Sequence, residues 1–227
     1  MVLCRPQTQD QHVHDEVFVR NEYKLPDRFE QGDLVIDIGA HVGMVAIACL
    51  ERGAEVWSYE PDIENFVVLE ENIEVAFYRR GTPHKAYNLA VWKPGVKYVS
   101  FTGYPEGFSA CGSMVPGLAV GKQHQRRAVR ATCLDDIVAQ ASRPIRLLKI
   151  DAEAAEYAIL YSAKPETIAC VKALAIEVHE PWTTDGVVRA GYEEYTGAGL
   201  KRFLEASGFD ARIEWAKKTQ LLFAKRP

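Results

Sequence analysis

From residue 33 onward, short apolar runs rich in β-branched residues alternate with longer stretches in which apolar residues recur at helical spacing. This alternation is typical of an α/β domain, in which helices cover both faces of a mostly parallel sheet. A chain of 227 residues is long enough for one such domain and too short for two ordinary domains and a linker. The sequence therefore predicts a single domain over residues 1–227, with residues 1–31 as an N-terminal extension or lid.

The strands and helices of this domain can be assigned from their periodicity. We expect parallel strands at residues 34–38, 55–59, 86–91, 145–150 and 173–179. Helices are expected at residues 42–51, 62–78, 152–163 and 199–207, the last closed by Gly208.

Two regions depart from the alternation. Residues 209–215 and 220–225 predict a hairpin, so the sheet should end antiparallel. Residues 96–101 are expected to pair with the third strand as a hairpin partner, and residues 102–131 to form a long loop, because they lack clear periodicity.

Composition narrows the class of partner. Lys and Arg number 27 against 31 Asp and Glu, a net charge of −4, which gives no electrostatic reason to expect nucleic acid or an anionic membrane. The longest apolar stretch, residues 42–50, is far below the roughly 20 residues that span a bilayer. The five cysteines include no Cys-x-x-Cys pair, which favours a reducing cytoplasm. We expect a cytoplasmic protein that acts on a small molecule, and the sequence leaves open whether it forms a homodimer.

The strongest motif is a strand that runs into a glycine-containing turn and then a helix, with the sequence VIDIGAHVG at residues 35–43. Glycines at such a turn let a ligand approach backbone N–H groups and the positive end of the helix. A dinucleotide-binding turn would carry glycine where His41 stands, so NAD and FAD are disfavoured. Asp37, just before the first glycine, suits a ligand that has an ammonium group and no phosphate.

The second motif is Glu60, at the end of the second expected strand and 21 residues after Gly39. At about this distance an acidic side chain meets ribose hydroxyls in related folds. Each residue also has a structural interpretation, because Asp37 could be a turn carboxylate and Glu60 a charge that favours the N-terminus of a helix. Their occurrence on consecutive strands favours a site for a nucleoside.

A nucleoside with an ammonium group and no pyrophosphate describes S-adenosylmethionine, and the sequence resembles the FkbM family of methyltransferases. The resemblance runs from about residue 33 to residue 180, with a weaker tail to residue 209. Its further segments are YEPDIENFVVLEENI (59–73), NLAV (88–91), TCLDDIV (132–138), LLKIDAEAAEYAIL (147–160) and AIEVHE (175–180).

The resemblance implies a class I methyltransferase fold, a Rossmann-like three-layer sandwich whose mostly parallel seven-stranded sheet ends in a reversed C-terminal hairpin. It also implies the cofactor-binding residues. These are Asp37, Gly39, Ala40, His41 and Gly43 at the methionine end, Glu60 and Pro61 at the ribose, Asn88 and Leu89 near the adenine, and Asp151.

The resemblance further implies methylation of a hydroxyl on a sugar, polyketide or other secondary metabolite. Asp151 ends the fourth expected strand, and Glu177 and His179 alternate along the fifth, so all three should meet at the rim formed by the carboxyl ends of the strands. We expect these three residues to be catalytic, with His179 favoured over Asp151 as the group that takes the acceptor proton. Asp151 could instead cap a helix, and His179 could be a packing residue.

One segment departs from the family pattern. Residues 151–156 read DAEAAE, so Ala154 stands where the family usually has glycine. Alanine favours an uninterrupted helix here and weakens the inference about the substrate class. Glu153 and Glu156 are expected to stabilise the start of this helix.

Other candidates carry weaker signals. Asp151 and Glu177 offer only two carboxylate ligands, too few to demand a divalent cation, so we expect no metal. Trp182 and Tyr192 could line an apolar acceptor pocket. The remaining candidates are His12 and His14 as metal ligands on a lid strand, Ser109 and Ser113 near the site, and a basic cluster of Lys122, Arg126, Arg127 and Arg130 for a phosphate.

Two other functions remain open at this point. One is N-methylation of a different substrate class, although the chain lacks the Asn-Pro-Pro-Tyr motif that clamps exocyclic amines. The other is a non-catalytic nucleoside-binding module of the same fold, which would need no acid or base beside the methyl group.

Overall fold

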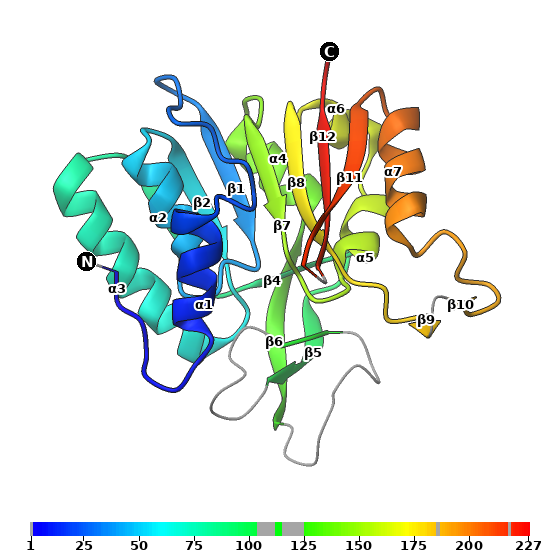
Figure 1. The fold of residues 1–227 in the computed structure, drawn as a ribbon, viewed down its shortest axis with the longest axis horizontal. Coiled ribbons are helices and arrows are strands. Elements are labelled where there is room, and N and C mark those ends of the chain that lie inside the picture. The colour runs from blue at the N-terminus through cyan, green and yellow to red at the C-terminus, as the bar shows by residue number, and fades with distance from the viewer. Residues whose placement is uncertain (1, 104–111, 115–124, 185–186, 218) are drawn as a thin grey trace.

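A seven-stranded sheet forms the centre of the computed structural model (Figure 1). The structure describes residues 2–103, 112–114, 125–184, 187–217 and 219–227. The strand order is β11-β12-β8-β7-β1-β2-β3, and β8, β7, β1, β2 and β3 run parallel. Its strands are β1 (Leu34–Ile38), β2 (Glu55–Tyr59), β3 (His84–Tyr87), β7 (Leu147–Ile150), β8 (Ala173–Val178), β11 (Asp210–Ala216) and β12 (Thr219–Lys225).

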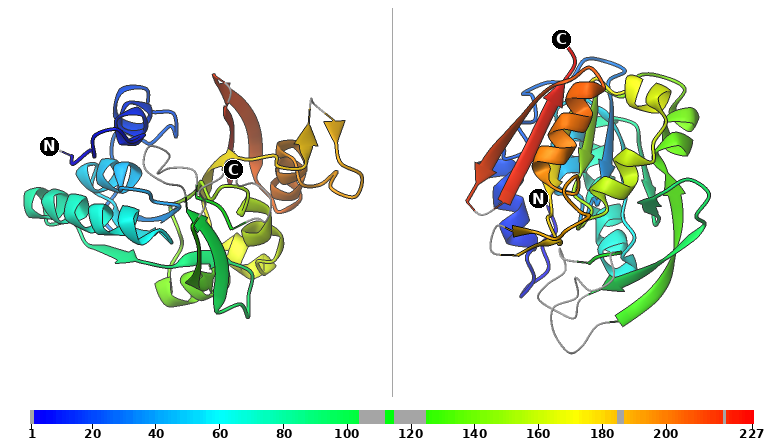
Figure 2. Two further views of the ribbon diagram at one scale, coloured as in Figure 1. Left: turned by 90° about the horizontal axis from the view of Figure 1, so that it is seen from below. Right: turned by 90° about the vertical axis from the view of Figure 1, so that its right-hand side faces the viewer.

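Helices cover both faces of this sheet, so the expected three-layer architecture is confirmed (Figures 1 and 2). One face carries α1 (Asp10–His14), the π-helical turn η1 (Asp15–Val19), α2 (Met44–Glu51) and α3 (Ile63–Arg80). The other face carries α4 (Leu134–Ala141), α5 (Glu156–Tyr161), α6 (Pro165–Ala169) and α7 (Gly197–Ala206).

Strand alternation decides which residue meets which layer. Leu34, Ile36 and Ile38 of β1 pack in the core beneath α4–α7, whereas Val35 packs against α2 and α3. Because side chains alternate along a strand, Asp37 lies on the face of Val35. The same period places Lys149 of β7 and Glu177 of β8 on that face, which puts three polar side chains near the carboxyl ends of neighbouring strands.

The C-terminal hairpin is confirmed. β11 pairs antiparallel with β12, and β12 pairs antiparallel with β8, so the sheet ends reversed. The helix before it ends as expected, with Gly208 in the left-handed region at φ 87°. Among the described helices, none is both long enough and apolar enough to cross a membrane.

The prediction of one strand over residues 86–91 was wrong. The chain forms β3, breaks at residues 88–89 and continues as β4 (Ala90–Trp92), which leaves the main sheet and pairs with β6. The break follows from Asn88, whose side-chain amide donates to the carbonyls of Glu60 and Pro61 at 2.9 and 3.1 Å.

The predicted hairpin partner and part of the predicted loop were also wrong. β5 (Tyr98–Gly103) pairs antiparallel with β6 (Gln125–Cys133), so residues 125–131 are strand, not loop. Together β4, β6 and β5 make a small second sheet at the lower edge of Figure 1. A further pair of two-residue strands, β9 (Thr183–Thr184) and β10 (Val187–Val188), precedes α7.

The helix predicted at residues 152–163 begins only at Glu156. Glu153 and Ala154 adopt left-handed backbone conformations, with φ of 48° and 75°. The reason is the Glu156 carboxylate, which accepts hydrogen bonds from the backbone N–H groups of Ala152 and Ala154 at 3.0 and 3.2 Å. The turn therefore keeps its shape although Ala154 replaces glycine. The helix cap is Ala155, so Asp151 is not an N-cap.

Gly39 follows the carboxyl end of β1 and packs closely against Asp151 at the carboxyl end of β7. Its φ is +73°, and a Cβ on this residue would lie 1.7 Å from the backbone carbonyl oxygen of Asp151. A Cβ atom cannot be accommodated this close to the Asp151 backbone unless β7 moves away from β1. Gly39 therefore fixes how closely the two strand ends approach.

We expect Gly39→Ala to lower the free energy of unfolding by about 3 kcal/mol or more, because backbone strain adds to the clash. Gly32→Ala is the matched control, since Gly32 has φ +89° but a Cβ added there would have no atom within 4 Å. This control should lose only about 1–2 kcal/mol. Urea unfolding of both variants measures the difference, and equal losses would contradict the role of the close approach.

Candidate active site

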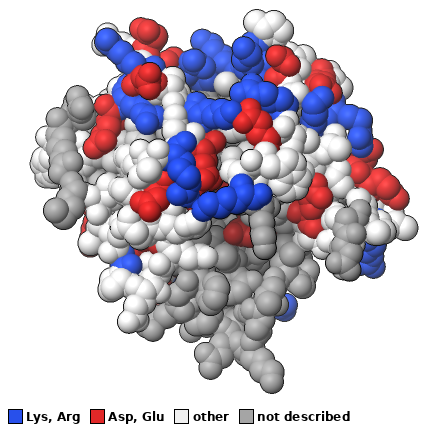
Figure 3. Space-filling model, viewed as in Figure 1, with Lys and Arg blue, Asp and Glu red and all other residues white. Residues whose placement is uncertain are grey.

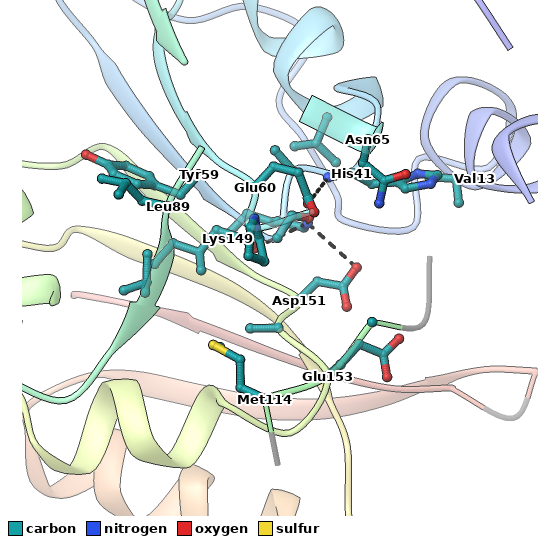
Figure 4. A pocket seen from close by; sticks show the side chains of 18 of the residues that line it. Val13, His41, Tyr59, Glu60, Asn65, Leu89, Met114, Lys149, Asp151 and Glu153 are labelled. Carbon is teal, nitrogen blue, oxygen red and sulfur yellow. Dashed lines mark hydrogen bonds and ion pairs between the residues drawn. The ribbon is translucent and has the colours of Figure 1, made fainter. Parts of the chain in front are cut away.

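A pocket opens where β1, β2 and β7 end. The left panel of Figure 2 views the molecule from this end of the sheet. The turn after β1 contributes Gly39, Ala40 and His41, and the turn after β2 contributes Glu60 and Pro61. Asp151 and Glu153 line it from the turn after β7, and Leu89 from the break between β3 and β4 (Figure 4). Most of the predicted cofactor-binding residues therefore meet in one place.

Lys149 lines this pocket and holds the strand ends together. Its ammonium group donates to the carbonyl oxygen of Gly39 at 2.7 Å and pairs with the carboxylate of Asp37 at 3.2 Å. It lies 3.6 Å from Asp151 Oδ2 (Figure 4). Burial alone would lower the pKa of Lys149, but Asp37 and Asp151 raise it above its ordinary value. Lys149 is therefore a buried cation.

The Asp37 carboxylate lies outside the pocket that would hold the cofactor. It is fully buried, does not line the pocket and is paired with Lys149. Burial raises its pKa, and Lys149 partly offsets that rise. The expectation that Asp37 directly accepts from a cationic ligand does not fit this position. Asp37 instead positions Lys149.

Glu60 fixes the turn after β2 and reaches the pocket. Its carboxylate accepts from the backbone N–H groups of His41 and Asp62, both at 2.8 Å (Figure 4). Burial raises the pKa of Glu60 to about 8, although these backbone donors act in the opposite direction. A carboxylate has about four acceptor sites, so the bonds from His41, Asp62 and the Asn65 side chain leave one site for a ligand hydroxyl.

The other two predicted cofactor residues support the pocket from outside it. Asn88 holds the turn that contains Glu60 and Pro61. Gly43, at φ 90°, caps the start of α2, and a Cβ there would lie 2.7 Å from the Leu69 side chain. Neither lines the pocket.

The three predicted catalytic residues do converge. One ligand-type atom each of Asp151, Glu177 and His179 lie within 4.8 Å of one another. His179 Nδ1 is 3.0 Å from Glu156 Oε1, while its Nε2 is 3.6 Å from Glu153 Oε2 and 3.7 Å from Glu177 Oε1.

These partners raise the pKa of His179. Burial opposes its charge, but Glu156, Glu153 and Asp151 raise the pKa of His179 well above its ordinary value. The expectation that His179 takes the acceptor proton stays a prediction.

Two carboxyl groups near His179 have pKa values above those of ordinary surface carboxyl groups. Burial, reinforced by Asp151, raises the pKa of Glu177 to about 8. Burial also raises the pKa of Glu153 to about 7, while His179 lowers it. The rim of the pocket thus concentrates acidic groups in a partly buried place.

Sequence reasoning missed two important residues. Lys149 is a single charged residue inside the otherwise apolar run LLKI, and that interruption was a usable signal. Tyr23 had no such signal: it lies far away in the sequence, yet its hydroxyl is 3.0 Å from Asp151 Oδ2 and 3.2 Å from Glu177 Oε2.

The N-terminal segment packs over the pocket. Val13 and Tyr23 line it, and Arg5 donates to Asp10 at 2.9 Å and to Asn65 at 2.8 Å. His41 lies 3.3 Å from the same Asp10 carboxylate.

The weaker candidates fall in several places. His12 and His14 lie on helix α1 instead of a lid strand, and each pairs with an acidic neighbour. Ser113 donates to the carbonyl oxygen of Glu153 at 2.7 Å, next to the site. Arg127 pairs with Asp62 at 3.3 Å. Ser109 and Lys122 lie outside the described residues.

A family model described as the methyltransferase FkbM domain matches residues 37–211. The chain belongs to this family. It is a methyltransferase, and its cofactor is S-adenosylmethionine, as the motifs predicted. No significant match to a curated protein was found.

Solved structures are similar to this chain at low identity. A conserved hypothetical protein from Streptococcus pyogenes is 10% identical, with a TM-score of 0.50 over 94% of this chain and 95% of that chain. At this identity the likeness concerns the fold alone. The precorrin-6y C5,15-methyltransferase from Geobacter metallireducens is 11% identical, with a TM-score of 0.49 over 99% of this chain and 93% of that chain.

Proposed function

We propose that this methyltransferase transfers the methyl group of S-adenosylmethionine to a hydroxyl oxygen of a small molecule. The observation that carries the proposal is the composition of one pocket. Glu60 stands at one side of the Gly39 turn, and the carboxylates of Asp151 and Glu153 stand at the other. The first suits a ribose, and the second suits a reaction that releases a proton.

The residues that line this pocket favour one orientation of the cofactor. Its ribose hydroxyls would donate to Glu60, and its adenine would lie toward Leu89 and Tyr59. The methionine end would then follow the turn at Gly39 and Ala40, which brings the positively charged sulfonium toward Asp151. Opposite charges favour that placement in a partly buried site.

The reaction is an in-line displacement at the methyl carbon. The acceptor oxygen forms a bond to this carbon as the carbon–sulfur bond breaks, and S-adenosylhomocysteine leaves with the electron pair on sulfur. The hydroxyl proton passes to the carboxylate pair of Asp151 and Glu153. Aligning the two reactants can supply roughly 7 to 11 kcal/mol, and a base adds about 10²- to 10⁴-fold.

The body of the acceptor would occupy a second cavity beside this pocket. Trp182 and Tyr192 stack at 4.8 Å and, with Tyr157 and Tyr195, line a cavity of about 460 Å³. Ala154 borders this cavity, and its neighbour Glu153 borders the cofactor pocket. An acceptor with an apolar or aromatic body could thus present a hydroxyl to Asp151 and Glu153.

The charge distribution favours a small acceptor over a nucleic acid. On the face shown in Figure 3, Lys and Arg side chains gather along the upper edge, over the amino ends of the parallel strands. The pocket lies at the carboxyl ends, where Asp151, Glu153 and Glu177 face it or flank it. Phosphates would be repelled there.

The N-terminal residues would act as a lid. With Val13 and Tyr23 of this segment in place, and Met114 beside the pocket, the pocket encloses about 70 Å³. Small-molecule sites typically measure about 300–1,000 Å³. Cofactor entry therefore requires these residues to move outward. Their return would exclude water from the sulfonium and the acceptor.

Calorimetry tests the cofactor site. We expect S-adenosylmethionine and S-adenosylhomocysteine to bind and NADH not to bind. Glu60→Gln and Glu60→Ala should weaken both ligands by about 1 to 3 kcal/mol, because hydrogen bonds to the ribose are lost. Glu64→Ala, which removes an exposed carboxylate four residues further on, should leave affinity unchanged. Tight NADH binding without binding of the two sulfur compounds would contradict the assignment.

Transfer of labelled methyl groups to hydroxylated metabolites tests the reaction. Asp151→Asn should lower turnover by about 10²-fold or more and leave cofactor affinity within a few-fold, because the loss falls on the transition state. Glu205→Gln on α7 removes a remote surface charge and serves as the control. Label that enters amines and not hydroxyls, or an Asp151→Asn variant with parental turnover, would refute the proposal.

A further inference from the structure

The convergence of Asp151, Glu177 and His179 brings together a mixed set of metal ligands. Each offers one atom, two carboxylate oxygens and one imidazole nitrogen, and these atoms lie within 4.8 Å of one another. Cis ligands of a six-coordinate ion at about 2.1 Å are about 3 Å apart, and trans ligands about 4.2 Å apart. Small side-chain rotations would therefore bring all three atoms onto one cation.

The imidazole is oriented in the way that metal sites use. His179 Nδ1 lies 3.0 Å from Glu156 Oε1, and Glu156 is fully buried. Backbone N–H groups of Ala152 and Ala154 hold that same oxygen. Histidines that bind metals almost always donate their other N–H to a carboxylate or carbonyl, which fixes the ring. Nε2 is then the nitrogen turned toward Glu177.

Tyr23 holds the two carboxylates when the N-terminal segment is in place. Its hydroxyl lies 3.0 Å from Asp151 Oδ2 and 3.2 Å from Glu177 Oε2. Glu177 Oε1 is the oxygen that faces His179 Nε2, at 3.7 Å. One oxygen of each carboxylate is thus engaged by Tyr23, and the other oxygen of Glu177 faces the imidazole.

The surrounding charge also favours a cation. Four carboxylates, those of Asp151, Glu153, Glu156 and Glu177, surround His179. Among the described residues, Lys149 is the lysine or arginine within ion-pair distance of them, and His179 is their other basic neighbour. Glu156 Oε2 is buried and has no hydrogen-bond partner in the part of the chain that the structure describes. Protein donors therefore leave negative charge uncompensated at this place.

We propose that Asp151, Glu177 and His179 bind a divalent cation, with Glu156 and Tyr23 as the groups that orient these ligands. Two carboxylates and one imidazole suit Mn²⁺ better than Ca²⁺, which prefers oxygen ligands alone. The expectation of no metal counted Asp151 and Glu177 only, and His179 supplies the third ligand.

The proposal rests on the proposed function for its role in catalysis. Three protein ligands leave open positions for an acceptor hydroxyl, whose deprotonation the cation favours. With Asp151 as a ligand, Glu153 is the member of the carboxylate pair that remains to take the proton.

The test is direct binding to the full-length chain after removal of metals with EDTA. Mn²⁺ titration followed by electron paramagnetic resonance should show one site, with a nitrogen coupling from imidazole. His179→Ala should abolish the nitrogen coupling, and His179→Ala and Glu177→Gln should each weaken Mn²⁺ by at least 10-fold. Glu156→Gln should weaken it by about 10-fold, as loss of an orienting carboxylate does in other sites. Titrations with Mg²⁺ and Zn²⁺ show which divalent cation the site prefers.

His12→Ala is the matched control, because His12 also lies beside a carboxylate, Glu16, but on the surface helix α1. It should leave Mn²⁺ binding unchanged. Circular dichroism checks that each variant is folded. If His179→Ala does not fold, the Mn²⁺ affinity of the conservative variant Glu177→Gln decides the test. Absence of stoichiometric binding, or binding that these substitutions do not weaken, would overturn the metal site.

Cofactor calorimetry on the same samples separates this inference from the proposed function. S-adenosylmethionine binding with methyl transfer at full rate in EDTA would refute the metal site and leave the methyltransferase assignment intact. Mn²⁺ binding through His179 without hydroxyl methylation would support the metal site and refute the proposed acceptor.

Discussion

The buried ammonium group of Lys149 is the interaction on which the rest of the site depends. It joins the carboxyl ends of β1 and β7 by contacting the carbonyl of Gly39 and the carboxylates of Asp37 and Asp151. Removing one partner of such a buried set leaves an uncompensated charge, which commonly costs about 3–5 kcal/mol. The position of the Gly39 turn, and so the floor of the pocket, follows from this cation.

The acidic rim is a consequence of the same arrangement. Strand alternation places Asp37, Lys149 and Glu177 on one face, and one lysine cannot neutralise all the carboxylates that gather there. Glu156 holds His179 beside these carboxylates. A site of this kind attracts cationic ligands, which is consistent with a sulfonium cofactor and with a divalent ion beside it.

Local patterns were sufficient for much of the fold. The predicted bounds of β1 and β2 agree with the structure, and the C-terminal hairpin and Gly208 are where the turn signals indicated. These features depend on neighbours in sequence, such as β-branched runs and glycines with positive φ. The convergence of Asp151, Glu177 and His179 also followed from period-2 geometry and the shared edge of parallel strands.

The remaining features depend on contacts between distant residues. Tyr23 meets Asp151 across the fold, and Asn88 breaks a strand by binding the turn after β2. The left-handed conformation of Ala154 is imposed by Glu156 against the preference of alanine for helix. The raised pKa of His179 depends on three carboxylates brought together by folding. Except for the contact between Glu156 and Ala154, no short window of sequence contains these interactions.

The most direct test of the account is a crystal structure of the chain with S-adenosylhomocysteine. The account predicts ribose hydroxyls on the Glu60 carboxylate, the methionine end along Gly39 and Ala40, and the sulfur atom facing Asp151. A nucleoside bound away from Glu60, or a sulfur atom directed away from Asp151, would contradict it.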